Sequence, residues 1–404
     1  MRWPMSTIDA LKAKERYSLI GGPFGSNLTT RDYVDDGVPV IRGSNLPDDR
    51  AFHDYDFVFV SEEKADQLAS NLAFAGDVII TQRGTLGQVG VIPQGCKYER
   101  YVLSQSQMKL KVDEAVADSR YVYCFFRQPE TVQYIRNFDS SSGVPHINLG
   151  VLKAMRIPLP PLVNQRRIVE TVSAYDDLID NNRRRIKLLE DSVRLLFDEW
   201  FVRARLPAHL GAGYGDQPRH LSLDAICEDV KVPVLPETLA PDTPYVGLEH
   251  MPRRSITLND WGAVTDVSST KLCYKEGEVV FGKIRPYFHK VGVALTDGVC
   301  SSDAIVMRPK APQWKSLLVA LVSSDAFIAS TAQGMKEGSK MPRADWKQMK
   351  AYEITMPSQR VLEAFNAVVE PILEQCKTLA LHSRKLRTAR DLLLPRLMSG
   401  ELTV

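Results

Sequence analysis

The sequence predicts an α+β protein built from two tandem copies of a mixed α/β region, each copy followed by one long helix. The chain has 404 residues, which is enough for two or three domains, and its 44% hydrophobic and 25% charged residues are typical of globular proteins. Short segments recur in the same order along the chain, and a long amphipathic pattern follows a proline-rich segment in each copy.

The internal repeat is carried by short segments that return about 200 residues later. The offset between matching segments drifts by a few residues, as expected for two diverged copies with small insertions and deletions. We therefore interpret the chain as a tandem duplication. The matching segments are Gly76–Ile79 with Gly277–Val280, Val89–Val91 with Val291–Val293, and Ile157–Pro160 with Ile354–Pro357.

Each copy begins with about 150 residues of mixed pattern. Runs rich in β-forming residues alternate with Gly, Pro, Asn and Ser, which predicts short strands and loops. We also expect a helix over residues 119–138 and another over residues 314–332. The expected strands are Val38–Arg42, Asp77–Thr81, Val89–Ile92, Met108–Val112, Glu278–Phe281, Val291–Leu295 and Ala304–Arg308.

A long helix is predicted after the proline-rich end of each copy. Residues 162–206 contain neither Gly nor Pro, and their apolar residues follow a heptad seam that Asn182 interrupts. The second seam is weaker because it holds Gln375 and His382, and Pro371 should kink that helix or delay its start. The other seam positions are Ile168, Val172, Tyr175, Ile179, Ile186, Leu189, Val193, Leu196 and Trp200, then Val361, Phe365, Val368, Ile372, Leu379, Leu386, Ala389 and Leu393.

Two apolar seams in one chain need partners. Each helix could pack on its own globular region, but we favour an antiparallel coiled coil between the two helices, which relates the copies by a pseudo-two-fold axis. Asn182 and Gln375 lie near the middles of the two helices. A buried polar pair between them would fix the register of the coiled coil.

Several classes of protein are excluded by composition. No uninterrupted apolar run is longer than Leu317–Val322, which is too short to span a bilayer. No apolar signal-peptide stretch follows Met1–Pro4, so we expect a cytoplasmic protein. The 6 scattered cysteines and 7 histidines lack metal-ligand spacing, which predicts core thiols in a reducing compartment and no metal. The net charge of +2 neither requires nor forbids binding to nucleic acid.

Together with the duplication, several segments make the chain resemble the specificity subunits of type I restriction–modification systems. Some resemble the opening of the family's recognition domains and its Gly-rich strand-turn-strand. Others are similar to the entry of its central spacer helix and to its C-terminal signature. In the order of these four features, the segments are Gly22–Leu28 with Val38–Leu46, Thr81–Gly90, Ile157–Leu162 leading into Gln165–Val169, and Leu392–Leu402.

The resemblance implies a non-catalytic subunit, without cofactors, of a phage-defence complex. Residues 1–160 would form target recognition domain 1, residues 161–206 the central spacer helix, residues 207–357 target recognition domain 2, and residues 358–404 the C-terminal spacer helix and tail. Each recognition domain would read one half of a bipartite site in double-stranded DNA. The helices would set the spacing and dock two methyltransferase subunits, which motor and nuclease subunits would join.

The second copy departs from the family pattern. It has Gly282–Pro286 where the first copy has the Gln-Arg-Gly-Thr string of residues 82–85. Such differences are expected if the two copies read different DNA words.

Candidate DNA contacts are polar and basic residues on Gly-rich turns and polar loops. Arg and Lys suit guanine, Gln and Asn suit adenine, and Ser, Thr and Lys suit phosphates. The alternatives are turn chemistry for the serines, a salt bridge for Arg83 and a solvated charged loop in the second copy. The candidates are Gln82, Arg83, Thr85, Gln88, Ser104, Gln105, Ser141 and His146 in the first copy, and Lys283, Arg285, Tyr287, His289, Lys290, Lys336, Lys340 and Arg343 in the second.

Two strings imitate catalytic motifs without predicting an enzyme. Asp48 with Glu62–Lys64 fits only the loose pattern of a metal-dependent nuclease, and Gly211–Gly215 lacks the strand and helix that flank a nucleotide-binding turn. The amino-methyltransferase tetrapeptide and the Walker A string are absent. The alternative function is a coiled-coil scaffold, or a stand-alone DNA-binding protein that is not coupled to restriction or methylation.

Overall fold

The computed structural model describes residues 3–47, 50–138, 145–210, 219–333 and 341–403. The chain forms two compact units. The first contains Met1–Asp180 and Leu386–Val404, and the second contains Asn181–Lys385. The domain boundaries predicted from the sequence separate the α/β regions from the long helices, whereas each compact unit includes a section of both long helices.

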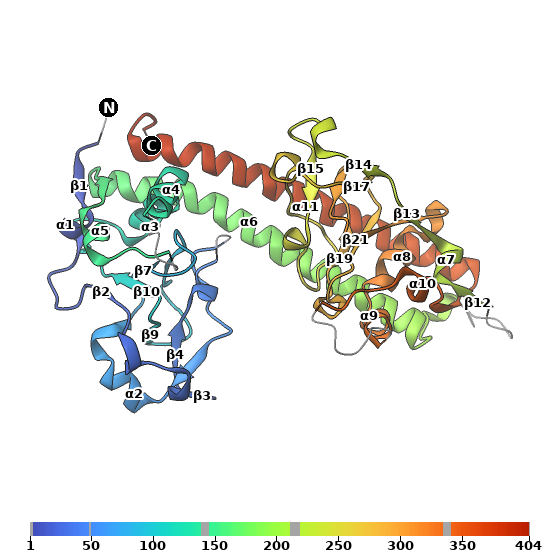
Figure 1. Ribbon diagram of the computed structural model, residues 1–404, viewed down its shortest axis with the longest axis horizontal. Coiled ribbons are helices and arrows are strands. Elements are labelled where there is room, and N and C mark those ends of the chain that lie inside the picture. Colours follow the sequence, from blue (N-terminus) through green and yellow to red (C-terminus); the bar gives the residue numbers. More distant parts are fainter. Residues whose placement is uncertain (1–2, 48–49, 139–144, 211–218, 334–340, 404) are drawn as a thin grey trace. The chain divides into compact units, whose positions relative to one another are not determined.

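Three sheets form the first unit (Figure 1). Their strands are β1 (Met5–Thr7), β2 (Leu19–Gly21), β3 (Tyr33–Val34), β4 (Val38–Ile41), β5 (Val58–Val60), β6 (Leu72–Ala73), β7 (Val78–Thr81), β8 (Val89–Val91), β9 (Tyr101–Leu103), β10 (Gln107–Leu110) and β11 (Arg156–Pro158). The order is β2-β10-β7-β8 in an antiparallel sheet and β3-β5-β4-β9-β6 in a second sheet, where β4 and β9 are parallel. Strand β1 pairs with β11.

The second unit repeats this plan. Its strands are β12 (Arg219–Ser222), β13 (Cys227–Val230), β14 (Pro233–Val234), β15 (Pro244–Val246), β16 (Gly262–Ala263), β17 (Lys271–Tyr274), β18 (Val279–Gly282), β19 (Val291–Val293), β20 (Gly298–Cys300), β21 (Ala304–Pro309) and β22 (Glu353–Met356). The sheets have the orders β13-β21-β18-β19 and β14-β17-β20-β15-β16, and β12 pairs with β22. Strands β15 and β20 are parallel, at the place that β4 and β9 occupy in the first unit. This shared topology confirms the tandem duplication.

Short helices pack around the sheets of each unit. They are α1 (Ile8–Leu11), α2 (Glu62–Gln67), α3 (Ser119–Arg127), α4 (Pro129–Arg136) and α5 (Leu149–Ala154), then α7 (Leu223–Ile226), α8 (Lys315–Val322), α9 (Asp325–Gln333) and α10 (Trp346–Met349). Each of the two helices predicted in the α/β regions is in fact a pair. Pro129 starts α4 because a proline lacks the N–H that a helix interior needs but fits the first helical position.

The core of each unit is built around one apolar helix. In the first unit Tyr121–Phe126 of α3 are all buried, and they share a core with strand residues such as Ile80. In the second unit α8 buries Leu317–Val322 against Phe281 and other strand residues. Within the described ranges no single helix is long and apolar enough to cross a membrane, although the pair Pro312–Val322 and Asp325–Gln333, bent by 68°, has a suitable length and composition.

The first long helix has the predicted seam. Helix α6 (Leu162–Phe197) continues into a π-helical turn at Asp198–Val202. All of the seam positions predicted for it are buried or half-buried, and Asn182 is only 5% exposed. The seam prediction for this helix is therefore confirmed, including its polar interruption.

The second long helix, α11 (Gln359–Ser399), requires a correction to the predicted seam. The positions 361, 365, 372, 379, 386 and 393 are buried or half-buried as predicted, but Val368, Gln375, His382 and Ala389 are exposed. In place of each of these four exposed residues, the next residue along the chain is buried. The predicted seam takes a three-residue step and then a four-residue step after Phe365, whereas the buried seam takes a four-residue step first. These positions are Val369, Cys376, Ser383 and Arg390. Pro371 neither ends nor delays the helix, which runs on through it.

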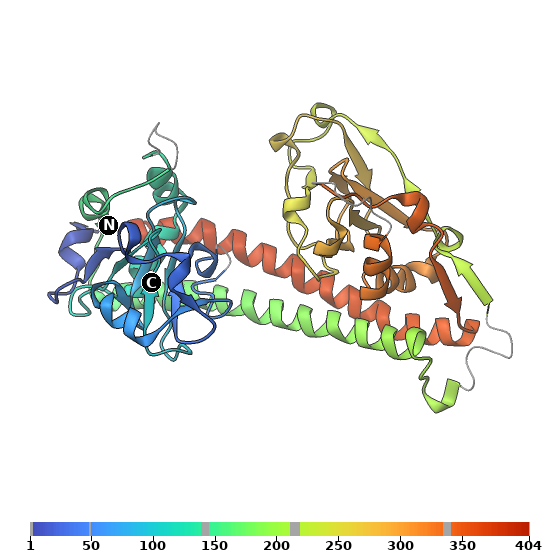
Figure 2. The ribbon, with the colours of Figure 1, turned by 60° about the horizontal axis from the view of Figure 1, so that its bottom comes forward.

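Both units pair α6 with α11 in an antiparallel arrangement (Figures 1 and 2). In the first unit, Asp176 on α6 forms an ion pair with Arg390 on α11. In the second unit, Asn182 donates to Ser383 over 3.2 Å, while in the π-helical turn that follows α6 the ring of Phe201 contacts that of Phe365. Residue numbers rise on one helix as they fall on the other, which confirms the antiparallel pairing. The partner of Asn182 is Ser383, so the predicted pair with Gln375 is wrong.

Candidate nucleic-acid interface

In the first unit the Gly-rich turn between β7 and β8 lies against the loop that precedes α5. The N–H of Gly84 donates to the carbonyl of Pro145 over 3.0 Å, and that of Ile147 donates to the carbonyl of Gln82 over 2.9 Å. These bonds flank a β-bridge between Arg83 and His146. Two candidate segments that are far apart in the sequence therefore form one surface.

The second unit holds its corresponding segments in the same way. The N–H of Arg285 donates to the carbonyl of Pro342 over 2.8 Å, and that of Ala344 donates to the carbonyl of Lys283 over 2.8 Å. A β-bridge joins Ile284 to Arg343. By this shared pattern Lys283 takes the place of Gln82, and Arg343 takes the place of His146.

A third segment completes the surface, between β9 and β10 in the first unit and between β20 and β21 in the second. The N–H of Gln82 donates to the carbonyl of Ser106 over 2.8 Å, as the N–H of Lys283 does to that of Asp303. The Lys283 ammonium also donates to the carbonyl of Ser302 over 3.0 Å. We call the three segments together the reading surface: residues 82–88, 104–106 and 145–147 in the first unit, and residues 283–290, 301–303 and 342–344 in the second.

Glycine is required in the turn of the first reading surface. Gly84 and Gly87 have φ of +92° and +93°, in the left-handed region that side chains disfavour. A Cβ on Gly87 would also lie 2.9 Å from a methyl carbon of Val132. The turn therefore keeps a backbone conformation that brings its main chain to the surface.

Two glutamines of the first reading surface hold loops as well as presenting polar atoms. The Gln82 amide donates to the carbonyl of Gln105 over 2.8 Å, and the Gln105 amide donates to the carbonyls of Gly25 and Leu28 over 2.6 and 2.7 Å. The loop fixed in this way carries Phe24, which is 83% exposed. These amides thus have a structural role beside any contact with bases.

The remaining first-copy candidates differ in exposure. Arg83, Thr85 and His146 are exposed, whereas Gln88 is half-buried and its amide oxygen lies 3.5 Å from the Thr81 hydroxyl. Ser104 is half-buried and hydrogen-bonded to the Gln107 side chain. Ser141 lies outside the described residues.

The second reading surface is more basic and carries aromatic rings. Arg285 and Tyr287 are exposed, and the guanidinium groups of Arg253 and Arg285 lie 4.1 and 5.7 Å from the centre of the Phe288 ring. Lys290 is half-buried, its ammonium donates to the carbonyl of Leu248, and burial lowers its pKa. Arg343 pairs with Asp303 over 3.1 Å. Lys336 and Lys340 lie outside the described residues.

His289 has a different role from the one expected. It is 4% exposed, its Nε2 lies 2.6 Å from the carbonyl of Ser323, and its Nδ1 lies 3.5 Å from an oxygen of Asp325. Burial lowers the pKa of this imidazole, so the neutral ring can donate from Nε2 to the carbonyl. His289 fixes the end of the turn from inside, and we omit it from the proposed DNA contacts.

The arrangement of the potential metal ligands and of the thiols can be described for the residues that the structure places. No group of three or more His, Cys, Asp or Glu residues in the described ranges is arranged to hold a metal ion. The six cysteines are free thiols, four of them buried, and burial raises the pKa of Cys124, Cys227, Cys300 and Cys376 to about 12.

Comparison with known proteins shows similarity to DNA specificity subunits. A family model described as the type I restriction modification DNA specificity domain matches residues 26–191. The specificity subunit of the MjaIX type I restriction enzyme of Methanocaldococcus jannaschii is 23% identical over 98% of this chain and 94% of its own length. That of the HindI enzyme of Haemophilus influenzae is 22% identical over 75% and 82%. The chain is therefore similar to type I specificity subunits over nearly its whole length.

A solved structure has the same fold as this chain. The crystal structure of the type I restriction–modification S subunit from M. genitalium covers 98% of this chain and 96% of its own, with a TM-score of 0.57 and 16% sequence identity. The two α/β regions with two long helices are thus the architecture of a known S subunit.

Sequence reasoning missed two residues near the reading surfaces. Phe24 lies in the segment Gly22–Leu28 that carries the family resemblance, but its 83% exposure is visible only in the structure. Arg253 lies 30 residues before the second turn in the sequence, so only the fold brings its guanidinium onto Phe288. The pair Arg253-Arg254 after Pro252 was the available signal.

Proposed function

We propose that this chain is the DNA-reading subunit of a type I restriction–modification complex, in which each unit reads one half of a bipartite double-stranded site. The observation that carries this proposal is the pair of reading surfaces. Both use the same main-chain hydrogen bonds, but Gln82 corresponds to Lys283 and His146 to Arg343. The same backbone arrangement with different side chains is expected for two domains that recognise different DNA sequences.

The chemistry of the two surfaces favours different bases. Side-chain amides such as those of Gln82 and Gln88 pair best with adenine, whereas Lys283 and Arg285 pair best with the acceptor edge of guanine. The basic residues also neutralise phosphates and release counterions, which supplies affinity that does not depend on sequence. We therefore expect the second half-site to contain guanine at the positions that this turn contacts.

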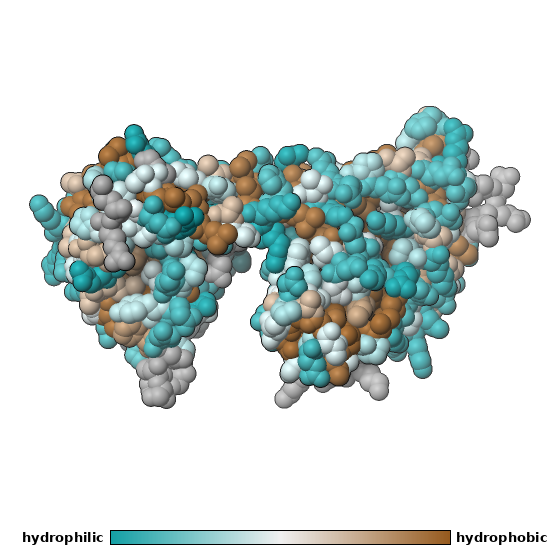
Figure 3. All heavy atoms as spheres, turned by 90° about the horizontal axis from the view of Figure 1, so that it is seen from above, coloured by the Kyte–Doolittle hydropathy of each residue, from teal (hydrophilic) through white to brown (hydrophobic). Residues whose placement is uncertain are grey.

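Exposed leucines on the long helices support the docking of other subunits. In the second unit, Leu188 and Leu195 of α6 are 67% and 66% exposed and lie one heptad apart. In the first unit, Leu178 of α6 is 47% exposed and Leu392 of α11 is 68% exposed. Apolar side chains reach the surface elsewhere too (Figure 3). We assign the helix leucines to two methyltransferase subunits, which motor and nuclease subunits then join. The chain itself performs no catalysis in this scheme.

The test is to express the chain with a type I methyltransferase subunit from the same genome, in a host that lacks DNA methylation, and to map modified bases across the genome. We expect a split motif that disappears when the chain is omitted. Methylation that is independent of this chain, while the methyltransferase is expressed and folded, would contradict the proposal. A coiled-coil scaffold or a DNA-binding protein not coupled to methylation would then be the better interpretation.

A further inference from the structure

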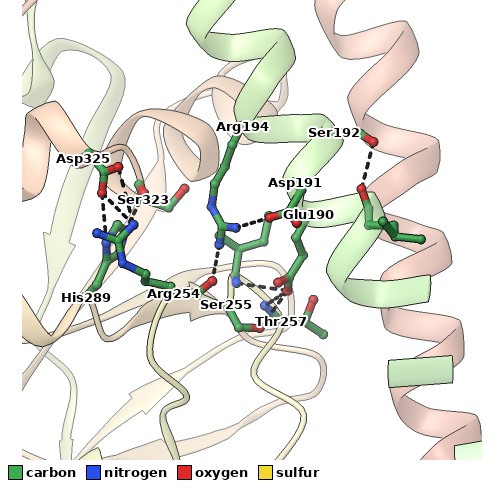
Figure 4. Close-up of polar contacts among 12 residues, drawn as sticks. Glu190, Asp191, Ser192, Arg194, Arg254, Ser255, Thr257, His289, Ser323 and Asp325 are labelled. Carbon is green, nitrogen blue, oxygen red and sulfur yellow. Dashed lines mark hydrogen bonds and ion pairs between the residues drawn. The ribbon is translucent and has the colours of Figure 1, made fainter. Parts of the chain in front are cut away.

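In the second unit a short loop, Arg253–Thr257, lies between helix α6 and the reading turn (Figure 4). On the helix side it meets Glu190, whose carboxylate oxygen accepts hydrogen bonds from the Ser255 hydroxyl over 2.8 Å and from the N–H groups of Ile256 and Thr257 over 3.0 and 2.9 Å. Glu190 is only 3% exposed. One buried carboxylate oxygen therefore binds three donors of one loop.

The other side of the same loop is bonded to the reading turn and to the strand that follows it. The N–H of Arg254 donates to the carbonyl of His289 over 3.0 Å, and that of Val293 donates to the carbonyl of Ile256 over 2.8 Å. The Arg253 guanidinium lies 4.1 Å from the centre of the Phe288 ring. The loop thus bridges the helix and the segment that holds Lys283–Lys290.

A second helix residue reaches the same loop one turn after Glu190. The Arg194 guanidinium donates to the carbonyl of Arg254, and it is oriented by an ion pair with Asp191 over 2.9 Å. Arg254 in turn pairs with Asp325 over 3.1 Å, and Asp325 also faces the ring of His289. Figure 4 shows these contacts leading from α6 to the inner side of the turn.

We propose that Glu190 and Arg194 are positioning residues for base reading, which hold the second reading turn at a fixed place on the spacer helix. This inference rests on the proposed function. Discrimination between bases requires donors and acceptors held to within about 0.5 Å, and that precision depends on the side chains behind the contact residues. Every contact of Glu190 and Arg194 described above lies in the second unit, so their effect belongs to one half-site.

The chemistry of Glu190 provides a conservative variant. Glu190→Gln keeps a side-chain oxygen that can accept from the two N–H groups and the hydroxyl. Glu190→Ala leaves the N–H groups of Ile256 and Thr257 without their acceptor, and the loop must shift to find another. Ser255→Ala and Arg194→Ala each remove one donor from the bridge. Ser192→Ala is the matched control, because the Ser192 hydroxyl bonds the carbonyl of Leu188 in its own helix.

The experiment maps methylation by the complex of each variant with its methyltransferase in the methylation-free host. The half-site of the second unit is identified beforehand as the half that Lys283→Ala changes. In Glu190→Ala we expect a rise in the methylation of sites that carry one mismatch in that half. Relative to the methylation of cognate sites the rise should be about tenfold, which corresponds to losing the discrimination at one base pair. We expect a smaller rise in Ser255→Ala and Arg194→Ala, and wild-type specificity at both halves in Glu190→Gln and Ser192→Ala.

The outcomes separate this inference from the function on which it rests. The absence of a chain-dependent motif in the wild type refutes the proposed function itself. If the wild type gives a split motif but Glu190→Ala retains full discrimination in both halves, or loses it equally in both, the positioning role is overturned. If Glu190→Ala does not fold, Ser255→Ala and Arg194→Ala decide, and wild-type specificity in both of them overturns the inference.

Discussion

The side-chain amide of Asn182 on α6 donates to the hydroxyl of Ser383 on α11 over 3.2 Å, and both residues are buried in the second unit. The Ser383 hydroxyl also donates to the carbonyl of Leu379, one turn earlier on its own helix, over 2.8 Å. Around this pair the seam is apolar, with Ile186 and Leu379 in one cluster. A single polar pair in an apolar seam specifies the register of two helices at some cost in stability.

This pair makes the first prediction. Asn182→Ala should lower the free energy of unfolding by about 1 kcal/mol, because a buried hydroxyl loses one partner. Ser383→Ala should cost a similar amount, and the double variant should cost less than the sum of the two single changes. Urea unfolding of the four proteins measures the coupling. Strict additivity would show that the two side chains do not act as a pair.

The seam shows how much of the helix packing the sequence could reveal. The periodicity of the apolar residues located both helices. It also located the buried Asn182, because the heptad pattern of α6 is regular enough to fit only one set of buried positions. In α11 two phases of the pattern share positions 365, 372, 379, 386 and 393, and the predicted phase placed Ala389 in the seam where the structure buries Arg390. The fold buries Arg390 nevertheless, because Asp176 lies opposite it. A partner on a distant segment is invisible to periodicity.

The ion pair of Arg390 gives the second prediction. Asp176 accepts from Arg390 and from Arg127, the latter over 3.1 Å. Asp176→Ala should therefore lower the free energy of unfolding by about 3 kcal/mol, since two cations lose a shared carboxylate. Arg390→Ala should cost only about 1 kcal/mol, because Arg127 still neutralises Asp176. Thermal or urea unfolding compares the two variants, and the reverse order would contradict this assignment of roles.

The third prediction concerns the salt dependence of DNA binding by the complex. Lys283→Ala combined with Arg285→Ala should reduce the slope of log K against log salt concentration by about 2, if each residue neutralises one phosphate. Lys275→Ala is the matched control, because Lys275 pairs with Asp297 over 2.8 Å at the other end of β18. Fluorescence anisotropy over a range of salt concentrations measures the slope. An unchanged slope in the double variant would remove these residues from the phosphate contacts.

The fourth prediction is a pH dependence of stability through Glu190. Burial raises the pKa of Glu190, against the opposing effects of hydrogen bonds from Thr257 and Ser255 and of the charge of Arg194. The native state therefore keeps the proton over a pH range in which the unfolded chain has released it. Across that range the contribution of Glu190 to the free energy of unfolding falls as pH rises.

Glu190→Gln cannot titrate, so its stability relative to the wild type should increase from about pH 4.5 up to the raised pKa and stay constant above it. Cys376, which faces Glu190, does not titrate in this range because burial, with the charge of Glu190, raises its pKa to about 12. Chemical unfolding of both proteins at several pH values measures the difference. A wild type that gains stability over Glu190→Gln as pH rises would contradict the prediction.

The candidate site was predictable in part. Turn glycines and clustered polar residues indicated the segments around Gln82 and Lys283, and the repeat indicated that they correspond. That the turn and the loop before α5 meet, as in the bridge of Arg83 and His146, depends on pairing between segments about 60 residues apart. His289 was misplaced because a basic residue in a polar turn gives no sign of burial, which here follows from its contact with Ser323.

The central claim is that the two reading surfaces each read one half of a DNA site. The most direct test compares genome-wide methylation by the complex carrying Arg83→Ala with Gln88→Ala against the complex carrying Lys283→Ala with Arg285→Ala. We predict that the first pair relaxes one half of the split motif and leaves the other intact, and that the second pair does the reverse. Relaxation of the same half by both pairs, or of neither half, would contradict the claim.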